Sequence, residues 1–339
     1  MTNFFNNLIK FFHFKKNEKY FKRIIFNENI NTIKYLEYII DLNKANTCVV
    51  SLENLKKNDS DNVKYYYFDS LFIISILFIF LKIKYLYTST PDLNNSFFRK
   101  SIYGKSKYIY IQHSPVSLCM AYKGNAFSDF DVLQVINKNQ YSDLLDINNF
   151  FKKKIKPFKS KYFFLDSLIK ENKNLSFTKI DYLIAPTWNS NFYELNLHND
   201  IFKILKRANK TFIFRPHYMS IYKKEFSFND LDLAKESIDT KSEFSFKNYT
   251  NLITDWSGIY LEFAIIKKIK PILINSKMKI RNKNFEKFSS KPIELELRDI
   301  LSVQFNIDEL DNLKKYISKD QKLETDNTQL LNTIDKMFY

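Results

Sequence analysis

Two histidines stand directly behind apolar segments of the kind that form buried strands. His113 follows Tyr108–Gln112, and His217 follows Thr211–Phe214 in the sequence FRPH. The pKa of histidine lies near neutral pH, so His113 could remove a proton from an attacking hydroxyl and His217 could supply a charge or a proton. Both are candidate catalytic residues, and a core histidine held by the backbone is the alternative for His113.

An arginine stands two positions before the second histidine. The planar guanidinium of Arg215 offers a fork of donors that matches the oxygens of a phosphate. Pro216 restricts the backbone between Arg215 and His217, so both side chains leave one tight segment. The three residues together favour phosphate binding over a purely structural role.

A third cluster lies in the sequence ITDWSGIYLEF, residues 253–263. We expect a strand that ends at Asp255 and a helix that begins near Ser257 and Gly258. The free N–H groups at a helix start bind phosphate, Ser257 could donate to it, and Gly258 would let it approach the backbone. Glu262, one turn later, is a candidate for binding a polyol or ribose hydroxyl. Plain capping by Asp255 or Ser257, and a solvated Glu262, are the structural alternatives.

A fourth cluster, Thr187, Trp188 and Asn189, follows the apolar segment Tyr182–Ala185. A polar loop at this point could contact a nucleotide base or its phosphates, and a simple turn is the alternative. We include Thr187 among the candidate nucleotide-binding residues.

Several nucleotide-binding motifs are excluded by composition. The chain has three glycines, Gly104, Gly124 and Gly258, which stand too far apart for GxGxxG or GxxxxGK[ST]. Their positions argue against a dinucleotide fold and a P-loop ATPase. No Asp-x-Asp pair follows an expected strand to hold a metal–nucleotide complex, and no zinc-ligand spacing is present. The donor phosphates would then be neutralised by arginine, histidine, lysines and the helix start. The sequence therefore predicts a metal-independent transferase without cofactor.

These clusters need a scaffold that brings the ends of several strands together. Apolar runs alternate with segments of helical spacing, which predicts parallel sheets with covered faces, and the length suits two α/β domains. Ligands of such sheets sit beyond the carboxyl ends of the strands, where all four clusters lie. We place an N-terminal acceptor-side domain at 1–160, a nucleotide-donor-binding domain at 161–320 and a C-terminal helix at 321–339.

The expected strands are short and rich in β-branched and aromatic residues. They are Arg23–Phe26, Thr47–Ser51, Lys84–Thr88, Tyr108–Gln112, Asp131–Val135, Tyr182–Ala185, Thr211–Phe214, Leu252–Thr254 and Pro271–Ile274. The lysine-rich run KKKIKPFKSK at 152–161 is expected to be a solvated loop, which also suits a linker or a basic rim.

Charge and apolar segments indicate the surroundings in which the chain works. A net charge of +16 attracts anionic partners such as phosphorylated substrates, acidic lipid or nucleic acid. Residues 1–26 combine aromatic residues with lysines, so they suit either a membrane interface or a helix packed on the domain. The run Leu71–Leu81 is too short to span a bilayer and predicts a buried helix. No signal peptide pattern is present, and we expect a cytoplasmic protein, with attachment to the inner face of the plasma membrane left open.

In order along the chain, the clusters resemble the CDP-glycerol glycerophosphotransferase family of teichoic acid and capsule synthesis. The segments that carry the resemblance lie between residues 80 and 275: YTSTPDL, KYIYIQHSPVS, AYKGNAFSDFDVLQV, LIAPTWNSN, FIFRPH, DTKSEFSFKNYTNLITDWSGIYLEF and KPILI.

The resemblance implies a B-type glycosyltransferase fold (GT-B) of two Rossmann-like domains. It implies that His113 is the base for the acceptor hydroxyl and that Arg215 and His217 hold the pyrophosphate. The implied partners are CDP-glycerol or a related CDP-polyol as donor, a lipid-linked or polymer acceptor and an anionic membrane surface, with no nucleic acid. The hydroxyl would attack the phosphorus that carries the glycerol, and CMP would leave.

Two departures from the family pattern leave the donor open. The family often has glycine where this chain has Ser114, and arginine or lysine where it has Asn189. Ribitol phosphate or another polyol phosphate could be the transferred group. A nucleotide-sugar glycosyltransferase of the same fold and a non-catalytic basic protein that binds nucleic acid or membrane are the alternatives.

Overall fold

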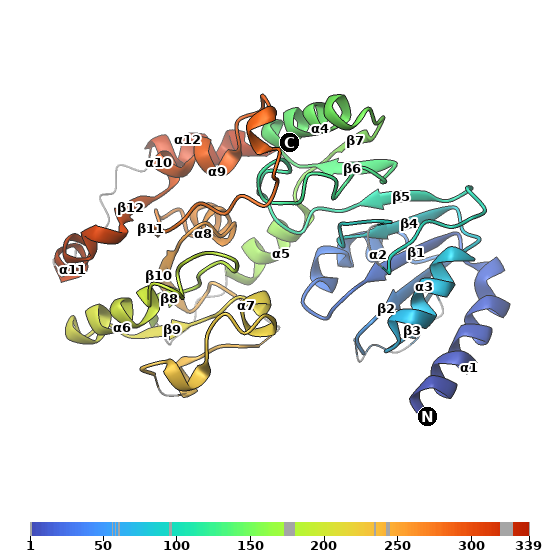
Figure 1. Ribbon diagram of the computed structural model, residues 1–339, viewed down its shortest axis with the longest axis horizontal. Helices are drawn as coiled ribbons and strands as arrows, with labels where there is room; N and C mark the ends of the chain where they lie inside the picture. Colours follow the sequence, from blue (N-terminus) through green and yellow to red (C-terminus); the bar gives the residue numbers. More distant parts are fainter. Residues whose placement is uncertain are drawn as a thin grey trace.

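The computed structural model describes residues 2–55, 57, 59, 62–94, 97–172, 180–233, 235–241, 245–318 and 328–338. Two parallel sheets lie side by side, each covered by helices (Figure 1). The expectation of two parallel α/β layers is therefore confirmed. The domain boundaries at 160 and 320 stay predictions.

The first sheet has seven strands in the order β3-β2-β1-β4-β5-β6-β7. Their bounds are β1 Arg23–Asn27, β2 Thr47–Ser51, β3 Val63–Tyr67, β4 Tyr85–Thr88, β5 Lys107–Tyr110, β6 Val132–Val135 and β7 Lys156–Lys159. Successive side chains of a strand point to opposite faces. Ile24 and Phe26 accordingly enter the core under α1 (Thr2–Asn17), α3 (Leu71–Ile79) and α4 (Lys138–Phe151). Ile25 enters the opposite core, which α2 (Glu37–Leu42) covers.

The second sheet has five strands in the order β12-β11-β10-β8-β9. Their bounds are β8 Ile180–Ile184, β9 Phe212–Phe214, β10 Tyr249–Thr254, β11 Ile272–Asn275 and β12 Val303–Asn306. Besides α5 (Phe163–Asn172), the helices that contribute to its two cores are α6 Leu197–Arg207, α8 Ile259–Lys267, α9 Ile293–Glu296, α10 Arg298–Leu301, α11 Leu310–Ser318 and α12 Thr328–Met337. In both sheets the strand order reverses once, between β1 and β4 and between β8 and β10, and such switch points are where open α/β sheets bind ligands.

Helix α5 (Phe163–Asn172) connects the two halves. Its Phe163 packs with the first sheet, and its Phe164 and Leu168 pack with the second. The two cores are thereby tied together by adjacent side chains of one helix.

The prediction of a solvated loop at 152–161 is wrong for the second part of that segment. Residues Lys156–Lys159 form the exposed edge strand β7, which pairs with β6 from Val132↔Lys156 to Val135↔Lys159. Pro157 lacks an N–H, which an edge strand tolerates, and lysines are common on such edges. Backbone pairing thus overrides the polar composition. Strands β3 and β12 were also not expected.

Both ends of the described chain are helical. Helix α1 buries Asn7 and Phe14 against the first sheet, while Phe4, Phe5, Ile9 and Phe12 are exposed. Helix α12 buries Leu330 and Met337, and residues 321–327 and 339 of the expected C-terminal helix lie outside the described residues. In the part of the chain that the structure describes, no helix is long and apolar enough to cross a membrane.

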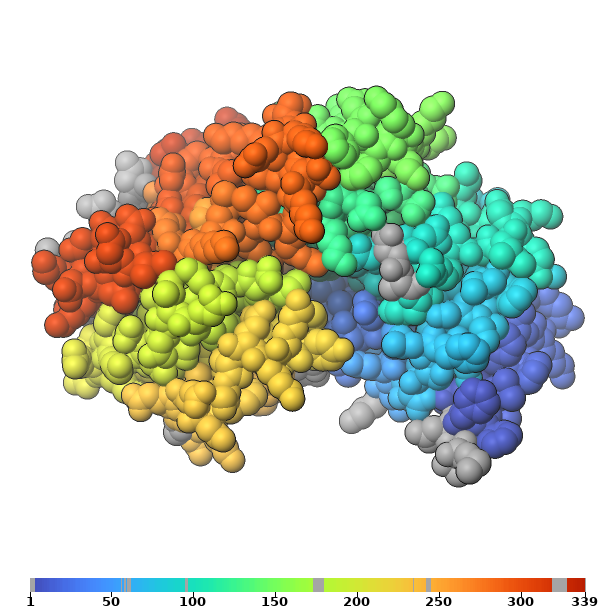
Figure 2. All heavy atoms as spheres, in the orientation of Figure 1, coloured from blue at the N-terminus to red at the C-terminus, as the bar shows by residue number. Residues whose placement is uncertain are grey.

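The halves touch through the loop that follows β5. Asn282 donates to the carbonyl of Cys119 (2.8 Å), and the N–H of Arg281 donates to the carbonyl of Met120 (2.9 Å). The N–H of Ser117 lies 3.0 Å from both oxygens of Glu294. Helix α7 (Tyr218–Tyr222) belongs to the second half. Away from this contact, a notch opens at the rim between the yellow surface of the second half and the blue surface of the first (Figure 2).

Candidate active site between the two sheets

His113 lies at the carboxyl end of β5 within a group of tyrosines. Tyr110 Oη lies 2.8 Å from Nδ1 and Tyr122 Oη lies 3.4 Å from Nε2, while the ring of Tyr35 is 5.9 Å away between centroids. Burial, with smaller contributions from Arg281 and Lys279, lowers the pKa of His113 to about 4. The imidazole is therefore neutral at pH 7 and able to accept a proton.

His217 is the first residue of the turn into α7. Its Nδ1 accepts a hydrogen bond from the N–H of Met219 (3.0 Å) and so caps the helix. Because a backbone N–H only donates, the ring proton must sit on Nε2. Burial, followed by Lys279, His113 and Arg215, lowers the pKa of His217 to about 3. His217 is thus a neutral Nε2–H donor whose orientation is set by the backbone.

Three cations surround the indole of Trp188, which is itself 6.2 Å from the His217 ring. The Lys223 and Lys279 ammonium groups lie 4.4 and 4.6 Å from the ring centroid, and the Arg281 guanidinium carbon lies 4.6 Å from it. Cations at this distance are attracted by the face of the ring. Burial lowers the pKa of Lys279 to about 7. Trp188, Lys223, Lys279 and Arg281 are called the cation cluster below.

The lysines and the arginine of this cluster were not predicted as site residues. Lys279 and Arg281 lie in an irregular segment after β11, without apolar periodicity. The Lys279 ammonium reaches Thr187 Oγ1 (2.8 Å), 92 positions earlier in the chain. Only the fold brings such positions together, and no local signal marks them.

Thr187 and Asp255 meet at the switch point of the second sheet. Asp255 is fully buried, and its carboxylate accepts hydrogen bonds from the N–H of Thr187 (2.7 Å) and from the hydroxyls of Ser190 and Ser276. These contacts fix the loop that carries Trp188. Asp255 therefore positions the site, and Thr187 presents its hydroxyl to Lys279.

Arg215 leaves β9 beside His217 and is held by its own half. Its guanidinium forms an ion pair with Asp239 (2.6 Å) and donates to the carbonyl of Lys241 (2.8 Å). A phosphate at this position would share Arg215 with Asp239. The side chain is thus oriented before any ligand binds.

The structure shows a reason for glycine at position 258 that the sequence analysis did not give. A Cβ on Gly258 would lie 2.6 Å from Ser114 Oγ and from Val116 Cγ1, so the loop after β5 packs directly against this glycine. Its φ of −60° is an ordinary helical angle. Close packing of the two halves requires glycine here, and phosphate binding at Gly258 stays a prediction. Ser257 Oγ lies 3.5 Å from the N–H of Ile259, the distance of a weak cap.

Glu262 faces the first half. Tyr162 donates to its carboxylate (2.7 Å), and burial raises the pKa of Glu262 to about 7, with Lys34 of the first half acting in the opposite sense. The Lys34 ammonium itself lies over the ring of Phe164 (4.6 Å). Glu262 is therefore a half-buried group of the interface, one of whose oxygens is already bonded.

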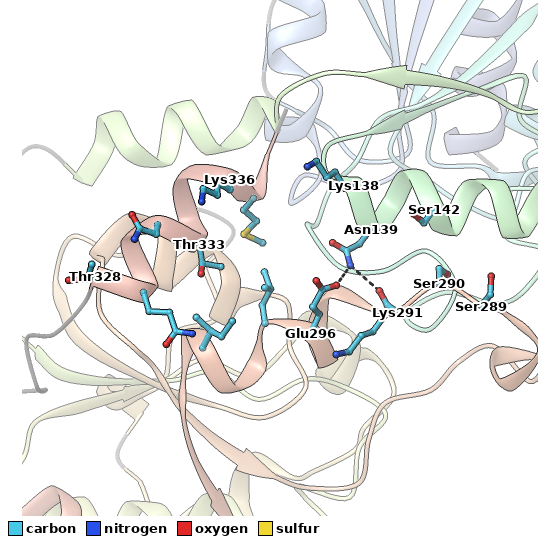
Figure 3. A pocket seen from close by; sticks show the side chains of 15 residues that line it. Lys138, Asn139, Ser142, Ser289, Ser290, Lys291, Glu296, Thr328, Thr333 and Lys336 are labelled. Atoms are coloured by element: carbon cyan, nitrogen blue, oxygen red, sulfur yellow. Dashed lines mark hydrogen bonds between the residues drawn. The ribbon is translucent and has the colours of Figure 1, made fainter.

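One cavity lies away from these residues. A groove of about 1060 Å³ runs between α4, the segment 289–297 and α12, and Asn139 bridges it by donating to Glu296 and to the Lys291 carbonyl (Figure 3). None of the predicted site residues lines it. Among the described residues, no group of three or more His, Cys, Asp or Glu could hold a metal ion.

Comparison with known proteins identifies the fold. No protein-family model and no curated protein matches this chain. Among solved structures, a histidine-to-alanine variant of the wall teichoic acid polymerase TagF superposes with a TM-score of 0.56 at 15% identity. The match covers 97% of this chain and 92% of that one.

The protein has the GT-B fold. A second structure of TagF, a histidine-to-asparagine variant soaked with CDPG, matches with a TM-score of 0.54 at 14% identity over 97% of this chain and 91% of that one. The two GT-B sheets correspond to the seven-stranded and five-stranded sheets described above. The fold expectation is confirmed.

Proposed function

We propose that this protein transfers glycerol phosphate, or a related polyol phosphate, from a CDP-polyol to a hydroxyl of a membrane-linked cell-surface polymer and releases CMP. One observation carries the proposal. A neutral His113 from the first sheet and a neutral His217 from the second lie near one another, beside the cation cluster. This arrangement supplies a base for a hydroxyl and positive charge for a diphosphate.

The cation cluster provides the donor site in this proposal. A CDP-polyol carries a diphosphate, and Lys223, Lys279 and Arg281 are the cations that the fold gathers beside His217. Positive groups in a water-poor site stabilise negative charge more strongly than in water. Arg215, held by Asp239, would contact the outer phosphate oxygens.

The reaction would proceed by direct displacement. His113 takes the proton of the acceptor hydroxyl as its oxygen attacks the phosphorus that carries the polyol. The bond from that phosphorus to the bridging oxygen breaks, and the oxygen leaves with CMP. The Nε2–H of His217 donates to a phosphate oxygen as charge develops there. Positioning and charge stabilisation supply most of the catalysis of such a step.

The comparisons support the proposal in two respects. One TagF structure was obtained after a soak with CDPG. The histidines replaced in the two TagF structures are separated by the same number of positions as His113 and His217. Donor, acceptor and catalytic roles in this chain remain proposals that rest on this likeness and on the site geometry.

The experiment is a donor panel. Purified protein is given CDP-glycerol, CDP-ribitol, UDP-sugars and GDP-sugars with membrane extract as acceptor, and released nucleotide is measured. We expect CMP from a CDP-polyol, lost in His113→Ala and retained in His13→Ala, a matched change on the exposed face of α1. Release of UDP or GDP would assign the protein to the sugar transferases. If no donor in the panel released a nucleotide, the proposal of an enzymatic role would be overturned.

The proposal also places an anionic membrane against α1. Phe5 is 59%, Ile9 67% and Phe12 62% exposed, and Lys16 and Lys19 follow on the exposed surface. Apolar side chains beside lysines suit an acidic lipid interface. Replacing Phe5 and Phe12 with serine should release the protein from phosphatidylglycerol vesicles, while Phe228→Ser, an exposed aromatic residue of the second half, should not. Equal binding of all three proteins would refute this attachment.

A further inference from the structure

The switch point of the first sheet also carries a polar cluster. Glu28 follows β1, and Ser89, Thr90 and Asp92 follow β4, the neighbouring strand. His113 follows β5, which pairs with β4 on its other side. Carboxyl ends of adjacent parallel strands share one edge of the sheet, so these residues and His113 lie along a single rim.

Two polar atoms of this cluster have no hydrogen-bond partner among the described residues. Ser89 is 3% exposed, and neither its hydroxyl nor Oδ1 of Asp92 has a hydrogen-bond partner within the described ranges. Unsatisfied buried polar atoms cost free energy and are rare, and a bound ligand is one explanation for them. The backbone of Ser89 is hydrogen-bonded to His113, so the unpartnered hydroxyl belongs to a residue that touches the proposed base.

The cluster is negative, in contrast to the donor side. Burial, opposed by a hydrogen bond from Thr90 and reinforced by Asp92 and Glu53, raises the pKa of Glu28. Asp92 is approached by Lys123 at 3.9 Å, at the outer edge of an ion pair. Carboxylates thus stand beside His113 and cations around Trp188, and Asp92 interacts with Arg281 of the cation cluster.

The carboxylates of Glu28 and Asp92 determine which kind of ligand could bind beside them. Carboxylates accept hydrogen bonds from hydroxyls, and Ser89 and Thr90 can donate or accept. A phosphate monoester brought beside Glu28 and Asp92 would meet like charge in a poorly solvated site. An uncharged acceptor end that is rich in hydroxyls therefore suits this cluster, whereas an acceptor end that carries a phosphate does not.

We propose that Glu28, Ser89, Thr90 and Asp92 form an acceptor subsite that holds the terminal polyol unit by its free hydroxyls and rejects an end capped by phosphate. The subsite rests on the proposed function for its place in the reaction. Held in this way, one hydroxyl lies at His113, and the phosphates of the preceding units extend away from the carboxylates.

Binding without donor tests the subsite directly. An alkyl glycerophosphate that ends in free hydroxyls, and the same compound with its terminal hydroxyl phosphorylated, are titrated into the protein by calorimetry. We expect the hydroxyl-ended compound to bind at least about tenfold more tightly. Glu28→Gln and Asp92→Asn should weaken that binding and reduce the preference. Asparagine tolerates the left-handed backbone of Asp92 (φ 64°), so the loop is retained.

Matched controls separate this effect from general loss of charge. Glu37→Gln and Asp41→Asn remove one carboxylate each from the exposed surface of α2 and should bind like the wild type. Unchanged binding in Glu28→Gln and Asp92→Asn, or equal affinity for both compounds, would overturn the subsite. Failure of the donor panel with intact acceptor binding would instead count against the proposed reaction alone.

Discussion

Gly258 and Ser114 bring the two sheets into contact, because a Cβ on Gly258 would lie only 2.6 Å from the Ser114 hydroxyl oxygen. The same Cβ would lie 2.6 Å from Cγ1 of Val116. A serine side chain can rotate away, but a β-branched valine has little freedom at χ1. The glycine therefore sets how closely the loop behind His113 approaches the second half.

Gly258→Ala should force these surfaces apart. We expect a loss of about 1–3 kcal/mol in the free energy of unfolding, the usual cost of overpacking, together with reduced CMP release. Adding Val116→Ala should restore part of both, which denaturant titration and the donor assay would show. A Gly258→Ala protein with unchanged stability and turnover would mean that the halves close differently from this structure.

Replacement of His217 by two different residues separates its capping role from its role as a donor. Asparagine is a good helix cap, so His217→Asn should keep the thermal midpoint near that of the wild type. Both His217→Asn and His217→Ala lack the Nε2–H, and turnover should fall by on the order of 10²–10³ in each, as when one charge-stabilising donor is removed. Near-normal turnover in His217→Asn would reduce His217 to a structural cap.

Lys279 should make donor affinity depend on pH. Burial lowers its pKa to about 7, so its charge, and with it the attraction for a diphosphate, is present below pH 7 and is lost above it. Donor binding should therefore weaken as pH rises from 6 to 8. Lys279→Arg, which stays charged, should flatten this dependence, and Lys279→Met should weaken binding throughout.

The control for this titration is Lys277→Met, an exposed lysine two positions earlier. It should reproduce the wild-type curve. A wild-type donor affinity that does not change between pH 6 and 8, or a Lys279→Met protein that binds as tightly as the wild type, would remove Lys279 from the donor site.

Glu294 should make the contact between the halves sensitive to pH. It is 2% exposed, and burial raises its pKa from 4.5 to about 7 although Ser117 donates to it. The folded protein thus holds a proton that the unfolded chain releases between pH 4.5 and 7, so this group's contribution to stability falls as pH rises through that window. Relative to Glu294→Gln, the wild type should lose up to about 3 kcal/mol.

Denaturant titrations at pH 5 and 7 measure this difference. Glu286→Gln, an exposed glutamate of the same segment, serves as control and should follow the wild type at both values. If the difference between wild type and Glu294→Gln were the same at pH 5 and 7, the glutamate would not change its protonation on folding in this range.

Much of the architecture could be predicted because strand cores carry a local signal. The segment Thr47–Ser51 was expected as a strand and is one, with all five residues buried. The ends of such runs also predicted where His113, Thr187, His217 and Asp255 would stand relative to the sheets. Apolar pattern and strand end are properties of neighbouring residues, and they can be recognised without a fold.

Other features were inaccessible to the same reasoning. The edge strand β7 carries lysines and a proline, and only the N–H and C=O groups of β6 make it a strand. Arg215 was expected to hold phosphate freely, but Asp239 from a loop 24 positions later shares it. Neither partner is marked in the sequence, because pairing across a sheet or a loop leaves no periodic pattern.

The sequence by itself determined the class of fold, two parallel α/β layers, and the candidate histidines at strand ends, since both follow from short-range pattern and from the geometry of parallel strands. The tertiary structure alone decided which groups surround those histidines. It brought Lys279 and Arg281 to Trp188, set Gly258 against Ser114 and gathered Glu28, Ser89 and Asp92 beside His113. These contacts join residues far apart in the chain, and they exist only when both cores are packed.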